Sequence, residues 1–479
     1  MIFTTADFLS ATPEIAMLIM VIVIIFADLF CGMRYKNTAY LLTQITLAFI
    51  FILCWRQYGG PSAINFNGLY LLDNIAIIAK LGILIISFLV FVYSRSYVAQ
   101  TKLPQGEYYL LGLFAILGMF VISSAASFLT LYLGLELLSL PLYAMVALQR
   151  DSGLASEAAM KYFIMGALAS GMMLYGISMI YGATHSLNFV EIFNSIFAAP
   201  ADHRLILVFG MGFIIVGIAF KLGVAPFHMW VPDVYEGAPG SVALFIGGAP
   251  KIAGFIIAIR ILVETMPALS SNWQPLLIVL ALLSIILGNL IAIVQTNIKR
   301  MLAYSSIAHM GYALLGLIAV TEKGFSSALF YVFSYSIMST GALGMVVLLS
   351  KIGFEAERIQ DFRGLNSRNP WLALMMLLIM FSMAGIPPTV GFFAKLGVLE
   401  AIINVHLIWL AATALLFSIV GAYYYLNIVK VMYFEEPEII TPVIASLDTR
   451  IAISINGLAI LLLGLFPSSL INLCRNLFG

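Results

Sequence analysis

The chain has 479 residues, of which 62% are hydrophobic and 9% are charged. Soluble globular proteins carry roughly 25% charged residues, so this composition is too poor in charge to cover a water-facing surface. The formal net charge of +1 excludes a polycationic face for nucleic acid, and the three cysteines have no spacing suited to zinc or an iron–sulfur cluster.

Long apolar stretches divide the chain, and about fourteen of them can cross a bilayer core, which takes about 20 residues per helix. Their approximate positions are 13–31, 38–55, 72–93, 108–124, 126–148, 157–182, 205–231, 241–263, 275–296, 301–320, 325–350, 371–403, 408–433 and 451–470. The first run is expected to be a retained helix, because no basic residue precedes it and no cleavage site follows it. The sequence therefore predicts an all-α polytopic membrane protein.

Basic residues in the loops predict the orientation, because Lys and Arg accumulate on the cytoplasmic side. With an even number of spans both termini lie on one side, whose loops and span ends hold Arg56, Arg204, Arg260, Lys323 and Arg475. The alternate loops hold a larger set: Arg34, Lys36, Arg95, Lys102, Arg150, Lys299, Arg300, Lys351, Arg358, Arg363, Arg368, Lys430 and Arg450. Both termini are therefore predicted to lie on the outer, periplasmic side of a bacterial-type inner membrane.

Several ionisable residues fall inside the predicted spans. A charge at the bilayer centre costs at least about 2.5–3.5 kcal/mol, so each needs a partner, a water cavity or a function. The central groups are Glu136, Lys221, Lys251 and His309, with Lys395 just past the middle of its span. A structural ion pair between Glu136 and Lys221 explains only part of the set, because one carboxylate is unable to neutralise three lysines. A buried lysine without a counter-ion can gain and lose a proton near neutrality, which favours a proton relay.

Two further lysines inside spans favour structural roles. Lys80 follows Asp73 by two helical turns on the same face. Lys161 lies near the end of its span and follows Glu157 at the i, i+4 spacing, which favours a local ion pair. Neither lysine is assigned to the relay.

Prolines interrupt two spans, at 205–231 and 371–403. Pro226 in the first, and Pro387 with Pro388 in the second, leave backbone carbonyls unpaired one turn earlier, and in lipid these oxygens need water or protein partners. Lys221 precedes the first break and Lys395 follows the second. Interrupted helices at corresponding places of two halves are typical of an ion pathway.

The two broken spans lie at the same place in two successive sets of five spans. In each set the fourth span is broken and the second span carries an ionisable residue, Glu136 or His309. Because each set has an odd number of spans, the second set enters the membrane from the opposite side and is inverted relative to the first. The fifth spans differ, since one contains Lys251 and the other Tyr423-Tyr424-Tyr425. The predicted organisation is three N-terminal helices in 1–100, inverted five-helix repeats in 101–268 and 269–435, and a C-terminal helix in 436–479.

Three segments carry a family resemblance. Residues 220–239 read FKLGVAPFHMWVPDVYEGAP, residues 299–311 read KRMLAYSSIAHMG, and residues 385–395 read GIPPTVGFFAK. They resemble the antiporter-like, proton-translocating membrane subunits of respiratory complex I, NADH-quinone oxidoreductase, over about residues 105–430. Within that family the sequence at 232–239 resembles the N subunits rather than the L or M subunits.

The resemblance implies a fourteen-helix subunit without redox centres of its own. NAD, FMN, iron–sulfur clusters and quinone would be bound by partner subunits, and the partners would be other membrane subunits of the complex and the lipid bilayer, with no nucleic acid. By matching position, Glu136 and Lys221 would form a coupling pair, Lys251 the central relay and Lys395 the group facing the outward exit. His309 would assist between the last two.

Other readings of the sequence stay open. The alternative function is that of a subunit of a multisubunit cation/proton antiporter, which shares the broken helices and lysines. The sequence Val-Tyr-Glu at 234–236 argues against it. A solute carrier would need a polar mid-span pocket that the sequence does not suggest, and the row of central lysines disfavours a purely structural subunit. The mixed-charge loop at 351–370 is interpreted as a solvated loop rather than as a docking site.

Overall fold

The computed structural model describes residues 4–31, 37–101, 103–198, 201–350, 354–437 and 446–478. Within these ranges thirteen helices are long and apolar enough to cross a membrane, which confirms the predicted all-α membrane fold. The interrupted stretch at 371–403 forms two helices of 15 residues each, and this division explains the difference from the fourteen predicted spans. Four residues used to predict the orientation lie outside the described ranges: Arg34, Lys36, Lys102 and Lys351.

The chain divides into two compact units. The first comprises Met1–Phe91, Lys102–Lys221 and Ala249–Gln274. The second comprises Val92–Thr101, Leu222–Gly248 and Pro275–Gly479. Three helices contribute residues to both units: α4 (Asn74–Gln100), α9 (Ala201–Leu222) with its last residue, and α13 (Ser270–Ile293).

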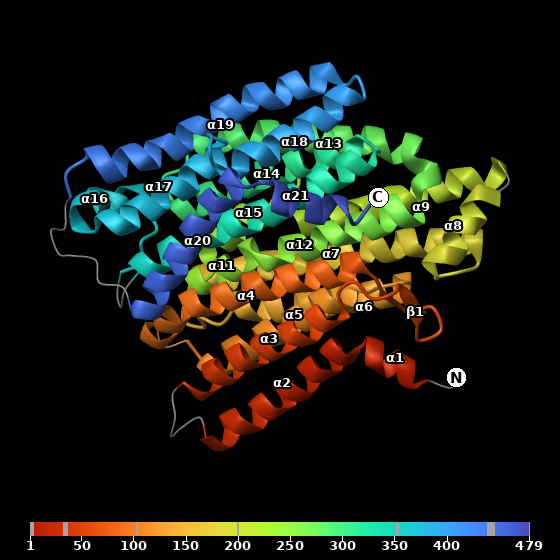
Figure 1. Ribbon diagram of the computed structural model, residues 1–479, viewed down its shortest axis with the longest axis horizontal. Helices are drawn as coiled ribbons and strands as arrows, with labels where there is room; N and C mark the ends of the chain where they lie inside the picture. The colour runs from red at the N-terminus through yellow and green to blue at the C-terminus, as the bar shows by residue number, and fades with distance from the viewer. Residues whose placement is uncertain are drawn as a thin grey trace. The chain divides into compact units, whose positions relative to one another are not determined.

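The first unit is a helical bundle with one small hairpin. Its other elements are α1 (Thr5–Ser10), α2 (Thr12–Cys31), α3 (Thr38–Gln57), β1 (Ala63–Asn65), β2 (Tyr70–Leu72), α5 (Gln105–Ser123), α6 (Phe128–Val146), α7 (Gly153–Thr184), α8 (Phe189–Ala198), α9 (Ala201–Leu222), α12 (Ala249–Ala258), the π-helical η1 (Ile259–Thr265) and the 3₁₀-helical η2 (Pro267–Leu269). Helix α5 packs against α2, α3, α6 and α12 (Figure 1). Glu136 on α6 and Lys251 on α12 are therefore carried by two helices that both contact α5.

The hairpin of the first unit was not predicted from the sequence. Strands β1 and β2 pair antiparallel, with Ala63 opposite Leu72. Gly68 between them has a φ of +85°, and a Cβ there would lie 2.2 Å from the side-chain nitrogen of Asn188. That nitrogen donates to the Gly68 carbonyl at 3.0 Å. Because residue 68 has no Cβ, the Asn188 side chain, directly before α8, can approach and bind the turn of the hairpin.

Asp7 joins α1 to the same hairpin. Its carboxylate accepts hydrogen bonds from the backbone N–H groups of Phe66 and Thr4, each at 2.7 Å. These bonds, the one from Phe66 foremost, lower the pKa of Asp7. Because a depressed folded-state pKa stabilises the fold above the unfolded-state pKa of about 3.9, this stabilisation is lost as the pH falls through the lower, folded-state value.

Acidification is therefore expected to loosen α1 from the hairpin before it affects the rest of the unit. Amide hydrogen exchange of residues 4–10, corrected for the intrinsic pH dependence of exchange, should accelerate as the pH falls below about 4. The Asp7→Asn variant should exchange faster already at neutral pH and show no such transition. Equal protection of the two proteins across this pH range would contradict the assignment.

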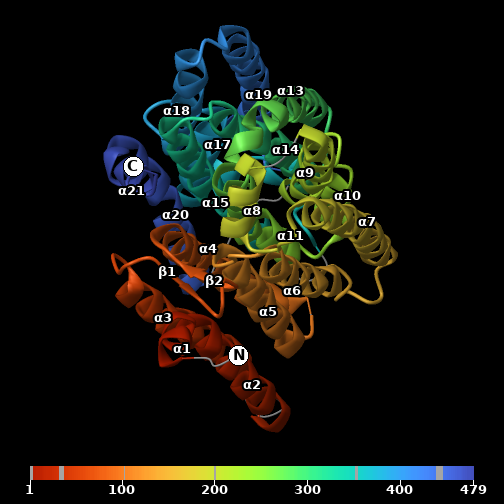
Figure 2. The ribbon, with the colours of Figure 1, turned by 90° about the vertical axis from the view of Figure 1, so that its right-hand side faces the viewer.

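The second unit contains two membrane-crossing helices that are almost entirely buried, Ile298–Ile318 and Glu322–Leu349. Its elements, besides parts of α4 and α13, are α10 (Trp230–Gly237), α11 (Gly240–Gly247), α14 (Ile298–Ile318), α15 (Glu322–Leu349), η3 (Ile359–Phe362), α16 (Leu365–Arg368), α17 (Pro370–Ala384), α18 (Val390–Asn404), α19 (Ile408–Phe434), α20 (Leu447–Leu465) and α21 (Ser468–Arg475). Helices α14, α15 and α18 pack on one another, and α18 lies beside α19 in both views (Figure 1 and Figure 2).

Both predicted helix breaks are present. Helix α9 ends before Gly223 and α17 ends before Gly385, and each glycine has a positive φ, +72° and +87°, which L-residues with a Cβ adopt only with strain. The peptide bonds before Pro226 and Pro388 are cis.

Serine hydroxyls bind backbone groups released at these breaks. Ser284 Oγ accepts from the Ala225 N–H at 2.8 Å, and Ser382 Oγ accepts from the Gly391 N–H at 3.0 Å. Irregular backbone at membrane depth requires such protein partners.

Candidate functional site

Glu136 and Lys221 lie on α6 and α9 of the first unit. The α6 helix begins after Ser127, whose side chain accepts from the Thr130 N–H and caps the helix. Lys221 donates to Ser139 Oγ at 2.6 Å, one turn beyond Glu136 on α6. In the described part of the chain no ion pair joins Glu136 to Lys221, and the Glu136 Oε1 atom is buried without a hydrogen-bond partner. The lysine is therefore bound by a neutral hydroxyl.

Lys251 lies in the first turn of α12 (Ala249–Ala258), a helix whose side chains are almost all buried. Its residue is 1% exposed, and every neighbour from Ile252 to Ala258 is buried as well. Together with Glu136 and Lys221, it belongs to the first unit. The prediction that Lys251 lies within a span, away from water, is confirmed.

His309 lies in the second unit on α14, whose membrane-crossing part is entirely buried. Both ring nitrogens are engaged by phenols: Nδ1 lies 2.7 Å from the Tyr331 hydroxyl and Nε2 lies 3.0 Å from the Tyr425 hydroxyl. Tyr425 also hydrogen-bonds the Ser305 hydroxyl one turn earlier on α14. The imidazole is thus part of a hydrogen-bonded chain that joins α15, α14 and α19.

Lys395 lies on α18, after the second break. Its ammonium donates to the carbonyl of Ala384, the last residue of α17, at 2.9 Å, and to Ser418 Oγ of α19, also at 2.9 Å. The same group lies 5.3 Å from the ring centre of Tyr312. Pro388 removes the donor that would have served Ala384 within a continuous helix, so the lysine takes its place. The predicted association of Lys395 with the break is confirmed.

The other lysines inside spans have carboxylate partners. Lys161 pairs with Glu157 at 2.8 Å, as predicted. Lys80 pairs with Glu14 at 2.5 Å and donates to the Tyr70 hydroxyl at 3.0 Å. The expectation that Lys80 shares its helix face with Asp73 as a structural pair was wrong about the partner, because packing brings Glu14 of α2 closer. Both lysines therefore form ion pairs with carboxylates.

Arg260 corrects the sequence analysis, which had placed it at a loop or span end. Its side chain is fully buried in η1 and pairs with Asp73 at 2.7 Å and Glu264 at 2.8 Å. It also donates to the Ser123 carbonyl at 3.1 Å. Because α12 continues into η1 without a loop, the apolar run extends past residue 260 and carries the guanidinium inside the bundle.

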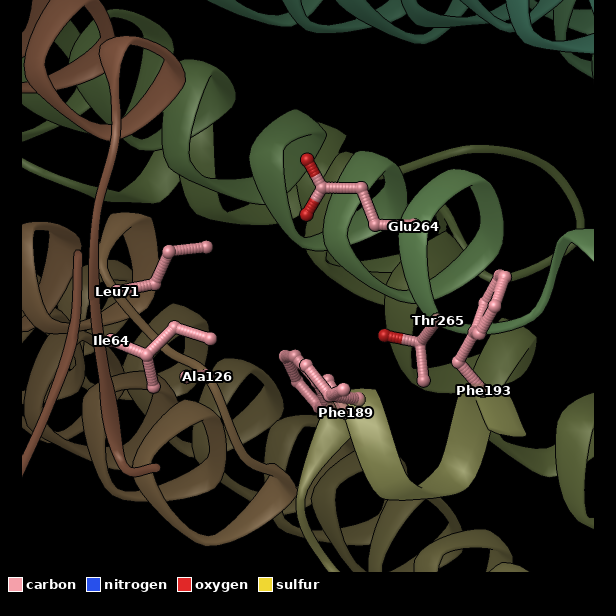
Figure 3. Close-up of a pocket in the computed structure, with 8 residues that line it drawn as sticks. Ile64, Leu71, Ala126, Phe189, Phe193, Glu264 and Thr265 are labelled. Carbon is pink, nitrogen blue, oxygen red and sulfur yellow. The ribbon is translucent and has the colours of Figure 1, made fainter. Parts of the chain in front are cut away.

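A cavity of about 290 Å³ opens beside this arginine network. It is lined by Ile64, Leu71, Ala126, Phe189, Val190, Phe193, Glu264 and Thr265. Figure 3 shows Glu264 and Thr265 on one wall, with Ile64 and Leu71 of the hairpin facing them and the rings of Phe189 and Phe193 projecting from α8. The three predicted relay residues of this unit are not among the lining residues, so the cavity is separate from them.

Lys299 and Arg300, also assigned to a loop by the sequence, begin α14 and bind acidic residues. Lys299 is 2% exposed and pairs with Glu357 at 2.5 Å, while Arg300 pairs with Asp233 at 2.9 Å and Glu236 at 2.7 Å. In the described part of the loop at 351–370, the Glu357 side chain is 36% exposed and also binds this buried lysine. These pairs fix α10, after the first break, to the start of α14.

Sequence reasoning missed the phenols around His309. Tyr425 was seen only as a departure from the repeat, and Tyr331 was not considered, because nothing in the spacing of α15 and α19 indicates that both face the same imidazole. The sequence signal that could have found Tyr425 was its place in the run of three tyrosines, Tyr423-Tyr424-Tyr425, near the centre of a span.

The comparisons with known proteins agree with this arrangement. The family described as NADH:quinone oxidoreductase/Mrp antiporter, TM, matches residues 125–421. NADH-quinone oxidoreductase subunit N of Coxiella burnetii is 56% identical over 466 residues, 96% of each chain. The protein of the same name from Nitrosomonas europaea is 51% identical over 471 residues, 98% of each chain.

Solved structures show the same fold. A chain of respiratory complex I from Thermus thermophilus with bound aureothin aligns with a TM-score of 0.82 at 31% identity, covering 97% of this chain and 99% of that one. A chain of the Mrp complex from Dietzia sp. DQ12-45-1b aligns with a TM-score of 0.86 at 19% identity, covering 99% and 98%; this likeness concerns the fold alone. The chain belongs to the NADH:quinone oxidoreductase/Mrp antiporter transmembrane family, in the branch of the N subunits of NADH-quinone oxidoreductase.

Proposed function

We propose that the chain is a proton-translocating membrane subunit of NADH-quinone oxidoreductase. The observation that carries the proposal is the kind of partner that two lysines inside the predicted spans have. Lys221 and Lys395 are bound by neutral oxygens and, among the described residues, form no ion pair with a carboxylate. Lys80 and Arg260, in contrast, are neutralised by carboxylates.

This difference separates two kinds of buried cation. A cation held by a carboxylate at ion-pair distance keeps its proton and fixes helices together. A buried lysine bound only by dipoles has no charge to compensate it, and burial disfavours its charged form. Such a group can take up and release protons, which a relay requires.

The proposed path uses the five groups predicted from the sequence. Glu136 and Lys221 form the coupling pair, Lys251 is the central relay, His309 assists, and Lys395 delivers the proton to the outward exit. When the Glu136 carboxylate moves away, Lys221 passes its proton through ordered water to Lys251. The hydrogen bond from Lys221 to Ser139 supports a pair that can separate, because the hydroxyl binds the lysine in the absence of the carboxylate.

The proposal includes the organisation of the chain. Residues 101–268 and 269–435 form inverted repeats, between three N-terminal helices and one C-terminal helix, and both termini lie on the outer side of the inner membrane. Electron transfer from NADH to quinone takes place in partner subunits, which bind NAD, FMN, iron–sulfur clusters and quinone. The neighbours of this chain are other membrane subunits of the complex.

Replacing Lys251 or Lys395 with alanine tests the relay. In the assembled complex in membrane vesicles, NADH-driven proton pumping should fall at least about tenfold in each variant, because a positioned proton-transfer group typically contributes about 10²–10⁴-fold. Lys323→Ala, which removes a half-exposed lysine paired with Glu400, should pump normally. Wild-type pumping in both relay variants, with normal assembly, would overturn the proposal.

A cation/proton antiporter is the alternative function, favoured only by the fold shared with the Mrp chain. It predicts cation-driven proton exchange in vesicles without NADH, and purification without flavin or iron–sulfur subunits. The proposed function predicts the reverse on both counts.

A further inference from the structure

The hydrogen bonds of His309 have a chemical consequence that concerns Tyr331 and Tyr425. A neutral imidazole has one N–H donor and one acceptor nitrogen. With a phenol at each nitrogen, at 2.7 Å and 3.0 Å, one hydroxyl donates to the ring and the other accepts from it. The ring therefore joins two hydroxyl groups on opposite edges into one directed hydrogen-bonded chain.

The chain extends beyond Tyr425 to Ser305, again through hydroxyl oxygens. All four groups are buried: Tyr331, His309, Tyr425 and Ser305 are at most 3% exposed. Each hydroxyl has one proton to give and a lone pair to accept another. In such a buried chain the hydrogen bonds strengthen one another, and no member has to carry a net charge at rest.

We propose that Tyr331, His309 and Tyr425 form a neutral proton wire that ends at Ser305, and that the two phenols carry protons in the relay. The inference rests on the proposed function and deepens it by adding two residues to the path. A proton arrives at the Tyr331 oxygen as this phenol gives its own proton to Nδ1. Nε2 gives its proton to the Tyr425 oxygen, and Tyr425 gives its own to Ser305.

The step balances. One proton enters at Tyr331 and one leaves from Ser305, while each oxygen keeps one proton and the imidazole changes from the Nε2–H to the Nδ1–H tautomer. Before the next proton can pass, the imidazole has to return to the Nε2–H tautomer, which takes the loss of the Nδ1 proton and the gain of a proton at Nε2. The unusual fifth span of the second predicted repeat, with tyrosines where the first has Lys251, thus contributes a phenol instead of an ammonium.

A neighbouring phenol provides the contrast. The ring of Tyr335 lies 5.0 Å from the imidazole, centre to centre, tilted by 36°, and within the described residues its hydroxyl makes no hydrogen bond to His309. Tyr335 contacts the ring by its face and shares the burial of Tyr331. Tyr335→Phe is therefore a matched control. It removes a phenol oxygen from a ring that packs against His309 but takes no part in the wire.

The test uses Tyr331→Phe, Tyr425→Phe and Tyr335→Phe in the assembled complex in vesicles. Proton pumping should fall at least about tenfold in the first two and stay at the wild-type rate in Tyr335→Phe. Loss of pumping in all three variants would indicate a packing role and overturn the wire, as would normal pumping in Tyr331→Phe or Tyr425→Phe. Normal pumping in these two together with loss in Lys395→Ala would reject the wire and leave the proposed function standing.

A second measurement separates proton transfer from positioning. A difluorotyrosine introduced at position 425 keeps the hydroxyl and the ring but makes the phenol more acidic. The wire predicts that this variant pumps and that its pH profile shifts relative to wild type, whereas the same substitution at position 335 leaves the profile unchanged. An unshifted profile at position 425 would show that the hydroxyl only positions His309, and would contradict the proposal.

Discussion

The Arg260→Met variant is expected to lose most of the stability that holds α12 and η1 in the first unit. Methionine fills a similar volume but leaves Asp73 and Glu264 without their cation. Removing one partner of a buried ion pair costs about 3–5 kcal/mol, and we expect the lower end because the Glu264 side chain is 34% exposed and can be solvated. The measurement is the thermal stability and yield of the assembled complex.

Neutralising the carboxylates in the same background is the control. The triple variant Arg260→Met with Asp73→Asn and Glu264→Gln no longer contains unpaired charges, so it should recover a large part of the lost stability. If the triple variant is as unstable as Arg260→Met alone, the arginine contributes through packing and through its bond to the Ser123 carbonyl rather than through the two carboxylates.

The Glu136→Gln variant is expected to have the largest effect on turnover with little change in packing. Glutamine keeps the shape of the side chain but removes the carboxylate charge of the proposed coupling pair. The charge of Glu136 then no longer distinguishes the two arrangements of that pair. Pumping coupled to quinone reduction should fall at least about tenfold, measured in the same vesicles as the lysine variants.

Glu157→Gln is the matched control for this substitution. It removes a carboxylate that is 61% exposed and pairs with Lys161 one turn away, where exposed pairs contribute little. We expect normal pumping from it. A Glu136→Gln complex that assembles and pumps at the wild-type rate would exclude the proposed coupling pair.

The apolar pattern was sufficient to predict the membrane helices, both breaks and the position of Lys251 inside a span. Each of these follows from properties local to the sequence: run length, proline chemistry and the position of a charge within a run. The pair Glu157 and Lys161 was predicted for the same reason, because residues four apart on a helix are neighbours.

Partners from distant parts of the chain were not predictable in this way. Lys80 binds Glu14 rather than the nearby Asp73, and Asp73 binds Arg260, 187 positions away. Tyr331 and Tyr425 meet His309 from separate helices. Such contacts depend on the direction in which each helix presents its face, which the spacing along a single helix does not contain.

The hydrogen bonds of Lys395 have a consequence for the energy of changing its charge. A protonated lysine has three N–H donors, and the described contacts of Lys395 use two, one to the Ala384 carbonyl and one to Ser418. The neutral amine still has two. Lys395 can therefore lose its proton while keeping both bonds, so the end of α17 stays capped in either charge state. The broken helix can remain structurally constant through a cycle in which this residue is charged and discharged.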